Sequence, residues 1–333
     1  MKIGILTAGG DCPGINAAIR GVCKTAISMY GMKVLGFSSG FRGLIEKDYK
    51  ELKEEQLSGI LTLGGTILGT SRDKPFQSGS KESVKLIKKN YKDLGLKAIV
   101  VIGGNGTQKT ASQLANEGLN VIGIPKTIDN DVYGTDVSFG FDSAVMIATE
   151  AIDRLHTTAN SHNRIMVIEL MGHHAGWISL YSGVAGGGDV ILIPEIPYSI
   201  KNISKYLKQR IKEDKKYSIV VVAEGIEKPE GEYAASYISN MIQKEVGIET
   251  RKTILGYIQR GGTPSPMDRI LATEFGSHTV ELIAQQKFGV MVCKKGNNIE
   301  SIPLSEVGGK IKLVSPDNPL IQKSRKMGIC FGD

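Results

Sequence analysis

Along this chain a short apolar, β-branched run repeatedly ends in a glycine-rich or polar turn, and a helical pattern follows. Runs that are apolar on both faces and alternate with helices predict parallel sheets covered on both sides. We therefore predict an α/β chain. The expected strands are 2–7, 33–37, 98–102, 120–124, 165–170, 190–193 and 218–222, and the expected helices are 15–29, 82–93, 109–116, 143–157, 199–213, 235–244 and 267–284.

Length and composition narrow the class of protein further. At about 150 residues per domain, 333 residues predict two doubly wound, Rossmann-like domains, each with its own core. Glycine accounts for 41 residues, but only 11 prolines and no Gly-x-y period exclude collagen and a disordered linker. No apolar run approaches the ~18–20 residues that cross a bilayer. The first residues have no signal-peptide pattern, so we expect a cytoplasmic protein without membrane contact.

The basic surplus and the cysteines have ordinary interpretations. The net charge is +7, yet Lys85, Lys88, Lys89 and Lys92 alternate with apolar residues, as on the solvated face of a helix. Interspersed charge of this kind suits small anionic ligands, and we expect no nucleic-acid partner. The cysteines form no C-x-x-C pair, so we expect free thiols at Cys12, Cys23, Cys293 and Cys330.

Two glycine-rich turns follow expected strands. Residues 9–14 (G-G-D-C-P-G) follow the first, and residues 103–107 (G-G-N-G-T) follow 98–102. Backbone N–H groups in such turns, with the dipole of the next helix, bind anions. The second turn nearly matches a Walker A loop, but Gln108 stands where that motif needs glycine, so we reject it. Thr107 is expected to cap the next helix or to bond a phosphate oxygen. A phosphate site and simple strand-to-helix turns remain competing interpretations.

Carboxylates and arginines elsewhere in the sequence are further candidates for a phosphate site. Thr127, Asp129 and Asp131 are two residues apart, so in an extended segment they would share a face. Paired carboxylates suit a proton acceptor and a Mg²⁺ partner in phosphoryl transfer to a hydroxyl, although aspartates more often cap turns. Arginines, which make bidentate phosphate contacts, stand beside expected strand ends or glycine turns at 72, 164, 251 and 260. Met171 and Trp177 are interpreted as core residues.

Four motifs together resemble the bacterial 6-phosphofructokinase family. They are residues 9–16 (G-G-D-C-P-G-I-N), 125–131 (P-K-T-I-D-N-D), 171–176 (M-G-H-H-A-G) and 256–262 (G-Y-I-Q-R-G-G), and the match runs in order through nearly the whole chain. The resemblance implies the phosphofructokinase fold. It also implies a phosphoryl-donor domain at 1–140 plus about 259–310, and a sugar-phosphate domain at about 141–258 plus 311–333.

The resemblance implies transfer of a phosphoryl group from Mg²⁺-ATP to the 1-hydroxyl of fructose 6-phosphate, a glycolytic step that gives fructose 1,6-bisphosphate. Asp129 would be the general base, with Thr127 holding the hydroxyl and Arg72 assisting catalysis. Mg²⁺ would bind Asp131, and Asn105 weakly or through water. The donor would contact Gly10, Arg72, Asp73, Gly104, Asn105, Gly106, Thr107 and Lys126. The sugar phosphate would contact Thr127, Asp129, Arg164, Met171, Gly172, His173, Glu224, Arg251, Tyr257 and Arg260.

The resemblance also implies an assembly. In the family, the arginines matching Arg164 and Arg251 reach in from a neighbouring subunit. We therefore expect a homo-oligomer, usually a tetramer, whose active sites are shared between subunits.

Three departures from the family pattern concern the donor. Asn105 replaces an aspartate that binds Mg²⁺ in ATP-type members. Lys126 resembles the pyrophosphate-type enzymes, whereas the well-known ATP enzymes have glycine there. Gly106 favours ATP, because pyrophosphate-type members usually carry an aspartate there that would repel an ATP phosphate. We hypothesise that Lys126 compensates for the lost carboxylate and that ATP is the donor. Pyrophosphate is the alternative.

Further departures concern the acceptor and an effector. His173 replaces a substrate-contacting arginine and is mostly neutral at pH 7, so another sugar phosphate such as sedoheptulose 7-phosphate is an alternative acceptor. At the family's nucleotide effector site, Glu54, His156 and Glu213 replace basic residues, which weakens anion binding. We therefore predict weak or absent activation by ADP. The cationic residues kept there are Arg20, Lys24, Lys215 and Lys216.

Two other functions would account for parts of the sequence. An NAD- or lipid-kinase-like protein would explain residues 103–107, but not Arg164, Arg251 or the Q-R-G-G segment. A catalytically weak, sugar-phosphate-binding regulatory subunit is suggested by Asn105 and His173. The presence of the 127–131 motif argues against it.

Overall fold

The computed structural model describes residues 1–77 and 81–333 and divides into two compact units. Unit 1 comprises Met1–Thr127, Asp131–Ser143 and Arg260–Lys312; unit 2 comprises Ile128–Asn130, Ala144–Gln259 and Leu313–Asp333. The chain therefore crosses between them repeatedly. The main crossings are at 143/144, 259/260 and 312/313, where the sequence led us to expect boundaries near 140, 259 and 310. Which ligand each unit binds stays a prediction.

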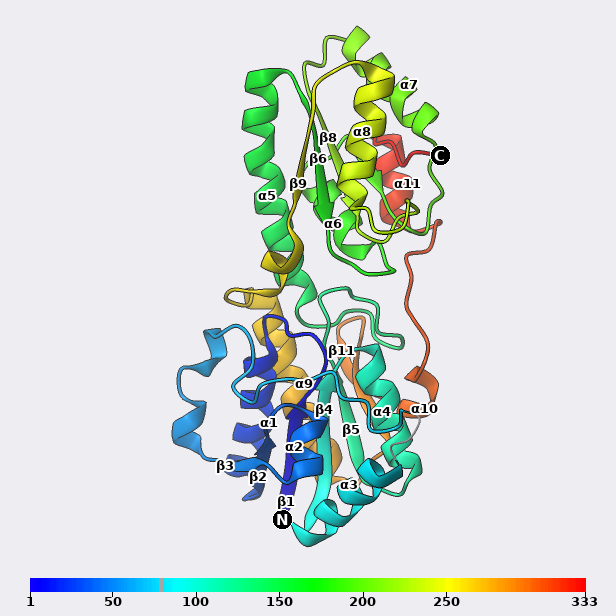
Figure 1. Ribbon diagram of the computed structural model, residues 1–333. Coiled ribbons are helices and arrows are strands. Elements are labelled where there is room, and N and C mark those ends of the chain that lie inside the picture. Colours follow the sequence, from blue (N-terminus) through cyan, green and yellow to red (C-terminus); the bar gives the residue numbers. More distant parts are fainter. Residues whose placement is uncertain (78–80) are drawn as a thin grey trace. The chain divides into compact units, whose positions relative to one another are not determined.

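Unit 1 contains a seven-stranded sheet in the order β11-β10-β5-β4-β1-β2-β3 (Figure 1). The central strands are parallel, as expected, but β3 pairs antiparallel with β2, and β11 with β10. The two outermost, antiparallel strands were not predicted, because β3 and β11 are mostly exposed and carry no apolar run. The strands are β1 (Lys2–Thr7), β2 (Lys33–Phe37), β3 (Tyr49–Leu52), β4 (Leu96–Gly103), β5 (Val121–Pro125), β10 (Val290–Lys295) and β11 (Asn298–Pro303).

Helices cover the apolar strands of unit 1. A core that includes Phe37, Leu44 and Leu114 lies between the sheet and helices α2, α3 and α4. Helix α1 packs along α9, and a Cβ at Gly21 would lie 2.8 Å from the Thr273 carbonyl oxygen, so glycine is needed for this close approach. The helices are α1 (Ile15–Tyr30), α2 (Phe41–Glu46), α3 (Lys81–Asp93), α4 (Asn105–Asn116), α9 (Pro266–Ala284) and α10 (Leu304–Val307), with 3₁₀ turns η1 (Glu54–Leu57) and η2 (Ile60–Thr62).

Unit 2 contains a four-stranded parallel sheet in the order β7-β8-β6-β9 (Figure 1). Its core includes Val167, Leu192, Val220 and Ile238. Strand β9 was missed because most of its residues are exposed at the sheet edge. The strands are β6 (Ile165–Leu170), β7 (Val190–Leu192), β8 (Ser218–Ala223) and β9 (Thr250–Ile254). The helices are α5 (Phe141–His162), which begins in unit 1, α6 (Trp177–Ala185), α7 (Ile200–Lys212), α8 (Ala234–Val246) and α11 (Pro319–Lys326), with the 3₁₀ turn η3 (Gly256–Arg260).

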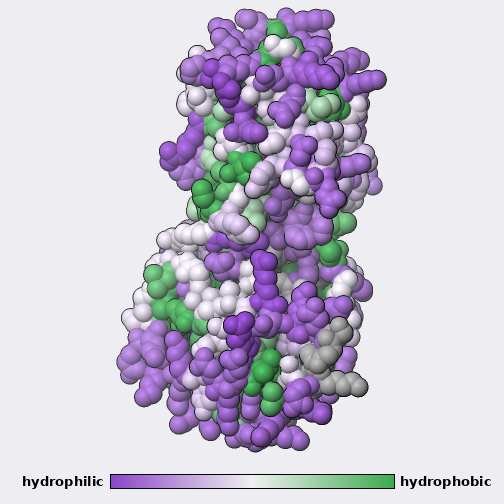
Figure 2. Space-filling view, in the orientation of Figure 1, coloured by the Kyte–Doolittle hydropathy of each residue, from purple (hydrophilic) through white to green (hydrophobic). Residues whose placement is uncertain are grey.

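The surface is mainly polar in the face that Figure 2 displays, where apolar residues form separate patches. Within 1–77 and 81–333, no helix has both the length and the apolar character needed to span a membrane. The four cysteines are free thiols, as predicted. Met171 and Trp177 are only partly buried, so their assignment to the core was wrong.

Candidate functional site

The loops that follow β1, β4 and β5 lie side by side at one edge of the unit 1 sheet, because these three strands are adjacent and parallel. Strand order reverses between β1 and β4, where the chain turns toward β2 on one side and β5 on the other. In open α/β sheets, ligands bind beyond the carboxyl ends of strands at such a reversal. The two glycine turns of the sequence flank this point.

The first turn is tightly built around an arginine. Gly9 and Gly14 have φ values of 84° and 102°, which favour glycine, and Gly14 caps α1. A Cβ at Gly10 would lie 2.7 Å from Arg260 Nη1, and that nitrogen donates to the Asp11 carbonyl at 3.2 Å. Arg260, which was expected among the sugar-phosphate residues, therefore belongs to unit 1 and lies against the first glycine turn.

The second turn leads directly into α4. Gly104 is the N-cap and Asn105 the first helical residue, so Thr107 lies in the first turn of the helix and the expectation that it caps the helix was wrong. Thr107 is buried, and a Cβ at Gly9 would lie 3.5 Å from its hydroxyl oxygen. The two glycine turns are therefore neighbours. Together they expose backbone N–H groups at the start of two helices, an arrangement that binds anions.

The side chain of Gln108 fixes the position of the second turn through hydrogen bonds. The side chain is fully buried, and its Nε2 donates to the carbonyls of Gly103 at 2.8 Å and Ile124 at 2.9 Å. One side chain thus ties the end of β4 to the end of β5. The sequence had singled out Gln108 only as the residue that breaks a Walker A pattern. Its fixing contacts depend on a strand pairing that spacing along the chain does not reveal.

Lys126 connects the second and first turns. Its backbone N–H donates to the Gly103 carbonyl at 3.0 Å, and its side-chain ammonium donates to the Gly10 carbonyl. The residue is only 3% exposed. Its positive charge therefore lies at the edge where the glycine turns meet. The nearby Cys12 thiol has a pKa raised to about 12 by burial, so it stays protonated.

The segment that carries the paired carboxylates bends. The chain turns at Ile128 and Asp129, and Asn130 has φ of 50°, so the expectation of an extended segment with one shared face was wrong. Thr127 and Asp129 are buried. Thr127 and Asp131 belong to unit 1, whereas residues 128–130 group with unit 2.

Asp131 lies beside the second glycine turn. Asn105 Nδ2 donates to Asp131 Oδ2 at 2.7 Å, and Asn105 Oδ1 is buried with no hydrogen-bond partner in the described structure. Carboxylate and amide oxygens are ligands of the kind that Mg²⁺ prefers, and this ion usually takes one or two carboxylates together with substrate phosphates. Among the described residues, no cluster of three or more His, Cys, Asp or Glu could hold a metal alone. The pair fits a Mg²⁺ ion that is completed by phosphate oxygens.

A third glycine-rich stretch, residues 64–71, contacts the first turn through its last two residues. Gly9 N donates to the Ser71 carbonyl at 2.9 Å, and Thr70 Oγ1 donates to the Gly9 carbonyl at 2.6 Å. The neighbouring Arg72 side chain is exposed. Asp73 accepts a hydrogen bond from Arg42 Nε at 3.0 Å; hydrogen bonding by Ser71, and then by Arg42, lowers the pKa of this carboxyl. Asp73 therefore stays ionised beside the predicted donor residues.

In unit 2, a second group gathers at the carboxyl ends of adjacent strands β8, β6 and β9. Glu224, after β8, accepts hydrogen bonds from the backbone N–H groups of Gly172 at 3.2 Å and His173 at 2.8 Å, which follow β6. His173 is exposed and has φ of 53°, a strained conformation for a residue with a side chain. Met171 N donates to Gln259 in η3, the turn that also carries the exposed Tyr257. These predicted sugar-phosphate residues therefore share one sheet edge.

Arg164 and Arg251 lie at the other end of these strands, where β6 and β9 begin. Arg164 precedes β6, and Arg251 is the second residue of β9. At about 3.3 Å per residue, six-residue β6 separates Arg164 from Met171 by roughly 20 Å. One small ligand bound in unit 2 cannot contact both groups. Glu249, to which no sequence pattern pointed, pairs with both arginines.

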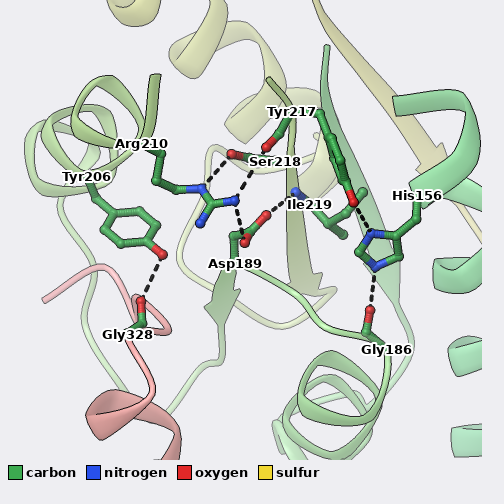
Figure 3. Close-up of polar contacts among 9 residues, drawn as sticks. All are labelled: His156, Gly186, Asp189, Tyr206, Arg210, Tyr217, Ser218, Ile219 and Gly328. Atoms are coloured by element: carbon green, nitrogen blue, oxygen red, sulfur yellow. Dashed lines mark hydrogen bonds and ion pairs between the residues drawn. The ribbon is translucent and has the colours of Figure 1, made fainter. Parts of the chain in front are cut away.

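His156, at a predicted effector position in unit 2, bonds within its own chain (Figure 3). His156 Nε2 bonds the Gly186 carbonyl at 2.6 Å, so this nitrogen carries a proton, and Nδ1 lies 3.1 Å from the Tyr217 hydroxyl. Both ring nitrogens are used. Nearby, Arg210 pairs with the partly buried Asp189 at 2.7 Å. Weak activation by ADP stays a prediction that these contacts favour.

Two α/β units, the first of which has anion-binding turns at the ends of its strands, define a class of phosphate-binding proteins. Comparison with known proteins identifies the family. A family model described as Phosphofructokinase matches residues 2–283. ATP-dependent 6-phosphofructokinase 3 of Bacteroides thetaiotaomicron is 62% identical over 336 residues, covering 100% of both chains. ATP-dependent 6-phosphofructokinase of Spirochaeta thermophila is 55% identical, covering 99% of this chain and 97% of its own.

Solved structures of phosphofructokinases have the same fold as this chain. Phosphofructokinase from Pichia pastoris in the T-state superposes with a TM-score of 0.85 at 35% identity, over 92% of this chain and 35% of that longer one. A pyrophosphate-dependent phosphofructokinase from Nitrosospira multiformis, at 21% identity, gives 0.88 over 100% of this chain and 92% of its own, a likeness of fold alone. The chain belongs to the phosphofructokinase family.

Proposed function

We propose that this chain is an ATP-dependent 6-phosphofructokinase, which transfers the terminal phosphoryl group of ATP to the 1-hydroxyl of fructose 6-phosphate. The observation that carries the proposal is the adjacency of the loops after β1, β4 and β5, which brings anion-binding turns beside the 125–131 motif. Identity of 62% along the full length of a relative named for this activity supports the same reaction.

ATP as the donor is supported by both relatives and by the second glycine turn. A Cβ at Gly106 would meet no atom within 4 Å, so a side chain there has room. The effect of glycine is therefore electrostatic: no carboxylate faces the donor phosphates. The buried Lys126 ammonium adds a positive charge at the junction of the turns. That charge stabilises negative charge on the transferred group, as in other phosphoryl transfers.

In the proposed mechanism, backbone N–H groups at Gly10 and Gly104–Gly106 hold the donor phosphates, and the exposed Arg72 approaches them from the third stretch. Thr127 orients the sugar hydroxyl. Asp129 accepts its proton as the oxygen bonds to the terminal phosphorus of ATP; the bond to the bridging oxygen breaks and ADP leaves. Asp131 and Asn105 would hold Mg²⁺, which when bound neutralises phosphate charge.

The sugar phosphate is proposed to bind residues from two copies of the chain. Met171–His173, Glu224 and Tyr257 line one edge of the unit 2 sheet, whereas Arg164 and Arg251 lie at the other. This separation supports a homo-oligomer, with a tetramer as the family expectation, in which the arginines of one subunit serve a neighbour's site. Exposed apolar side chains at Tyr257, Ile258, Met267 and Ile270 suit contacts with other subunits. A cytoplasmic location is part of the same proposal.

The test is a matrix of ATP, GTP and pyrophosphate against fructose 6-phosphate and sedoheptulose 7-phosphate, run on wild type and Asp129→Asn. We expect turnover with ATP and fructose 6-phosphate, and a loss of about 10³-fold or more in kcat for the variant, because the amide cannot accept the proton. Ser138→Ala, which loses a bond to the neighbouring Thr127 carbonyl, controls for local disturbance. Turnover with pyrophosphate alone, or an Asp129→Asn enzyme of normal rate, would contradict the proposal.

A further inference from the structure

Glu249 bridges the two arginines at the amino edge of the unit 2 sheet. Its Oε2 accepts a hydrogen bond from Arg164 Nε at 2.5 Å, and its Oε1 pairs with Arg251 Nη2. Glu249 and Arg164 stand directly before the paired strands β9 and β6, and Ile165 N donates to the Glu249 carbonyl at 3.2 Å. The sheet therefore fixes the backbones from which this three-residue bridge is made.

The bridge leaves phosphate-binding groups available. Arg164 is attached through Nε alone, and the described residues provide no hydrogen-bond partner for its two Nη groups. Arg251 uses one Nη, so both guanidinium groups keep several donors. Without the carboxylate, two like charges would face each other across neighbouring strands and repel. With it, both side chains are held at one separation.

Stability alone does not account for the bridge. The side chains of Arg164, Glu249 and Arg251 are 28%, 42% and 56% exposed, and ion pairs at such exposure contribute little to folding stability. A bidentate contact between a planar guanidinium group and a phosphate, in contrast, depends strongly on the orientation of that guanidinium group. Orienting two arginines before the ligand arrives lowers the entropy lost on binding.

We propose that Glu249 is a positioning residue for sugar-phosphate binding, which holds Arg164 and Arg251 in the arrangement that a phosphate group requires. The inference rests on the proposed function, in which both arginines bind the sugar phosphate. Glu249 itself repels the phosphate and does not contact it.

The experiment measures steady-state kinetics of wild type, Glu249→Gln and Glu249→Asp with fructose 6-phosphate and ATP. We expect Glu249→Gln to raise the KM for fructose 6-phosphate about tenfold, while kcat and the KM for ATP change less than about twofold. Glu249→Asp keeps the charge and recovers part of the affinity. Glu150→Gln removes the carboxylate of another exposed Glu–Arg pair, with Arg154, and is the matched control that leaves both KM values unchanged.

The outcomes separate the two proposals. An active wild type with an unchanged fructose 6-phosphate KM in Glu249→Gln overturns the positioning role, whatever happens to thermal stability. A lowered KM also overturns it, because Glu249 would then compete with the phosphate for the arginines. A wild type without activity on fructose 6-phosphate overturns the proposed function, and the inference with it.

Discussion

Asp268 is a buried carboxylate that joins two segments of unit 1. Its Oδ2 accepts hydrogen bonds from the Ser143 backbone N–H at 2.8 Å and the Ser143 hydroxyl at 2.6 Å, at the point where α5 leaves this unit. Its own backbone N–H donates to Ser265, the N-cap of α9. Asp268 therefore fixes the start of α9 against the start of α5, beside two of the chain crossings.

The pKa of Asp268 predicts a pH dependence of stability. Burial raises this pKa from 3.8 to about 6, so the folded protein binds the proton more tightly than the unfolded chain. The stability that the protonated form contributes is complete below about pH 4, falls as pH rises, and is lost above about pH 6. Asp268→Asn keeps the acceptor and removes the titration. We expect wild type to lose about 2–3 kcal/mol relative to this variant between pH 4 and pH 7.5.

Urea unfolding at both pH values, at one protein concentration, measures this difference. Asp73→Asn is the control, because hydrogen bonding by Ser71 and Arg42 lowers the pKa of Asp73 from its ordinary value of 3.8. Its titration therefore lies below the pH range of the experiment, and the difference in stability between wild type and Asp73→Asn should change little from pH 4 to pH 7.5. A difference between wild type and Asp268→Asn that stays constant from pH 4 to 7.5 would show that the carboxyl does not titrate in this range.

At the scale of elements, the connection between β4, β5 and α4 depends on Gln108. Replacing it by leucine removes a buried donor from the Ile124 carbonyl, at a cost of about 1–3 kcal/mol in the free energy of unfolding, and leaves the Gly103 carbonyl with the Lys126 N–H as its donor. Because Gly103 adjoins the second glycine turn, the turn also loses its fixed position. We expect the KM for ATP to rise about tenfold in Gln108→Leu, with less than about twofold change in the KM for fructose 6-phosphate.

Kinetics with each substrate varied in turn, together with thermal unfolding, test this expectation. Gln113→Leu makes the same exchange further along α4, at a partly buried position, and should change neither KM. A destabilised Gln108→Leu enzyme with an unchanged KM for ATP would restrict Gln108 to a structural role.

The elements show which parts of the fold a single sequence can predict. Strands such as β1, β4 and β6 were found because both of their faces are buried, which requires continuous apolar runs. Strands β3, β9 and β11 are exposed, so their residues alternate or are polar, and neither pattern separates them from loops.

Some parts of the candidate site could likewise be predicted from the sequence and others could not. Glycine turns at strand ends can be recognised from a few consecutive residues. The Arg164–Glu249 pair joins residues 85 apart, so no local sequence pattern indicates it. The 127–131 segment was misjudged because alternation holds only for extended backbone, and Asn130 takes a left-handed conformation.

At the scale of the whole molecule, the proposed sharing of sites between subunits can be tested with two inactive variants. Asp129→Asn destroys the base in a subunit's own site, and Arg164→Ala removes the cation that the same subunit would give to a neighbour. If sites are shared, a subunit carrying Arg164→Ala still has an intact base. A neighbour carrying Asp129→Asn can then complete that site with its own Arg164.

Mixing the two variants after reversible dissociation, or co-expressing them, should therefore restore activity. With random pairing at a symmetric interface, about a quarter of the sites combine the two intact residues, so activity should approach a quarter of the wild-type value. Each variant treated alone should stay inactive. The same mixture made with the double variant Asp129→Asn/Arg164→Ala as one component should also stay inactive, because no site can then obtain both residues intact. If the first mixture shows no recovery although size-exclusion chromatography and mass spectrometry detect hybrid oligomers, each site draws both residues from one chain.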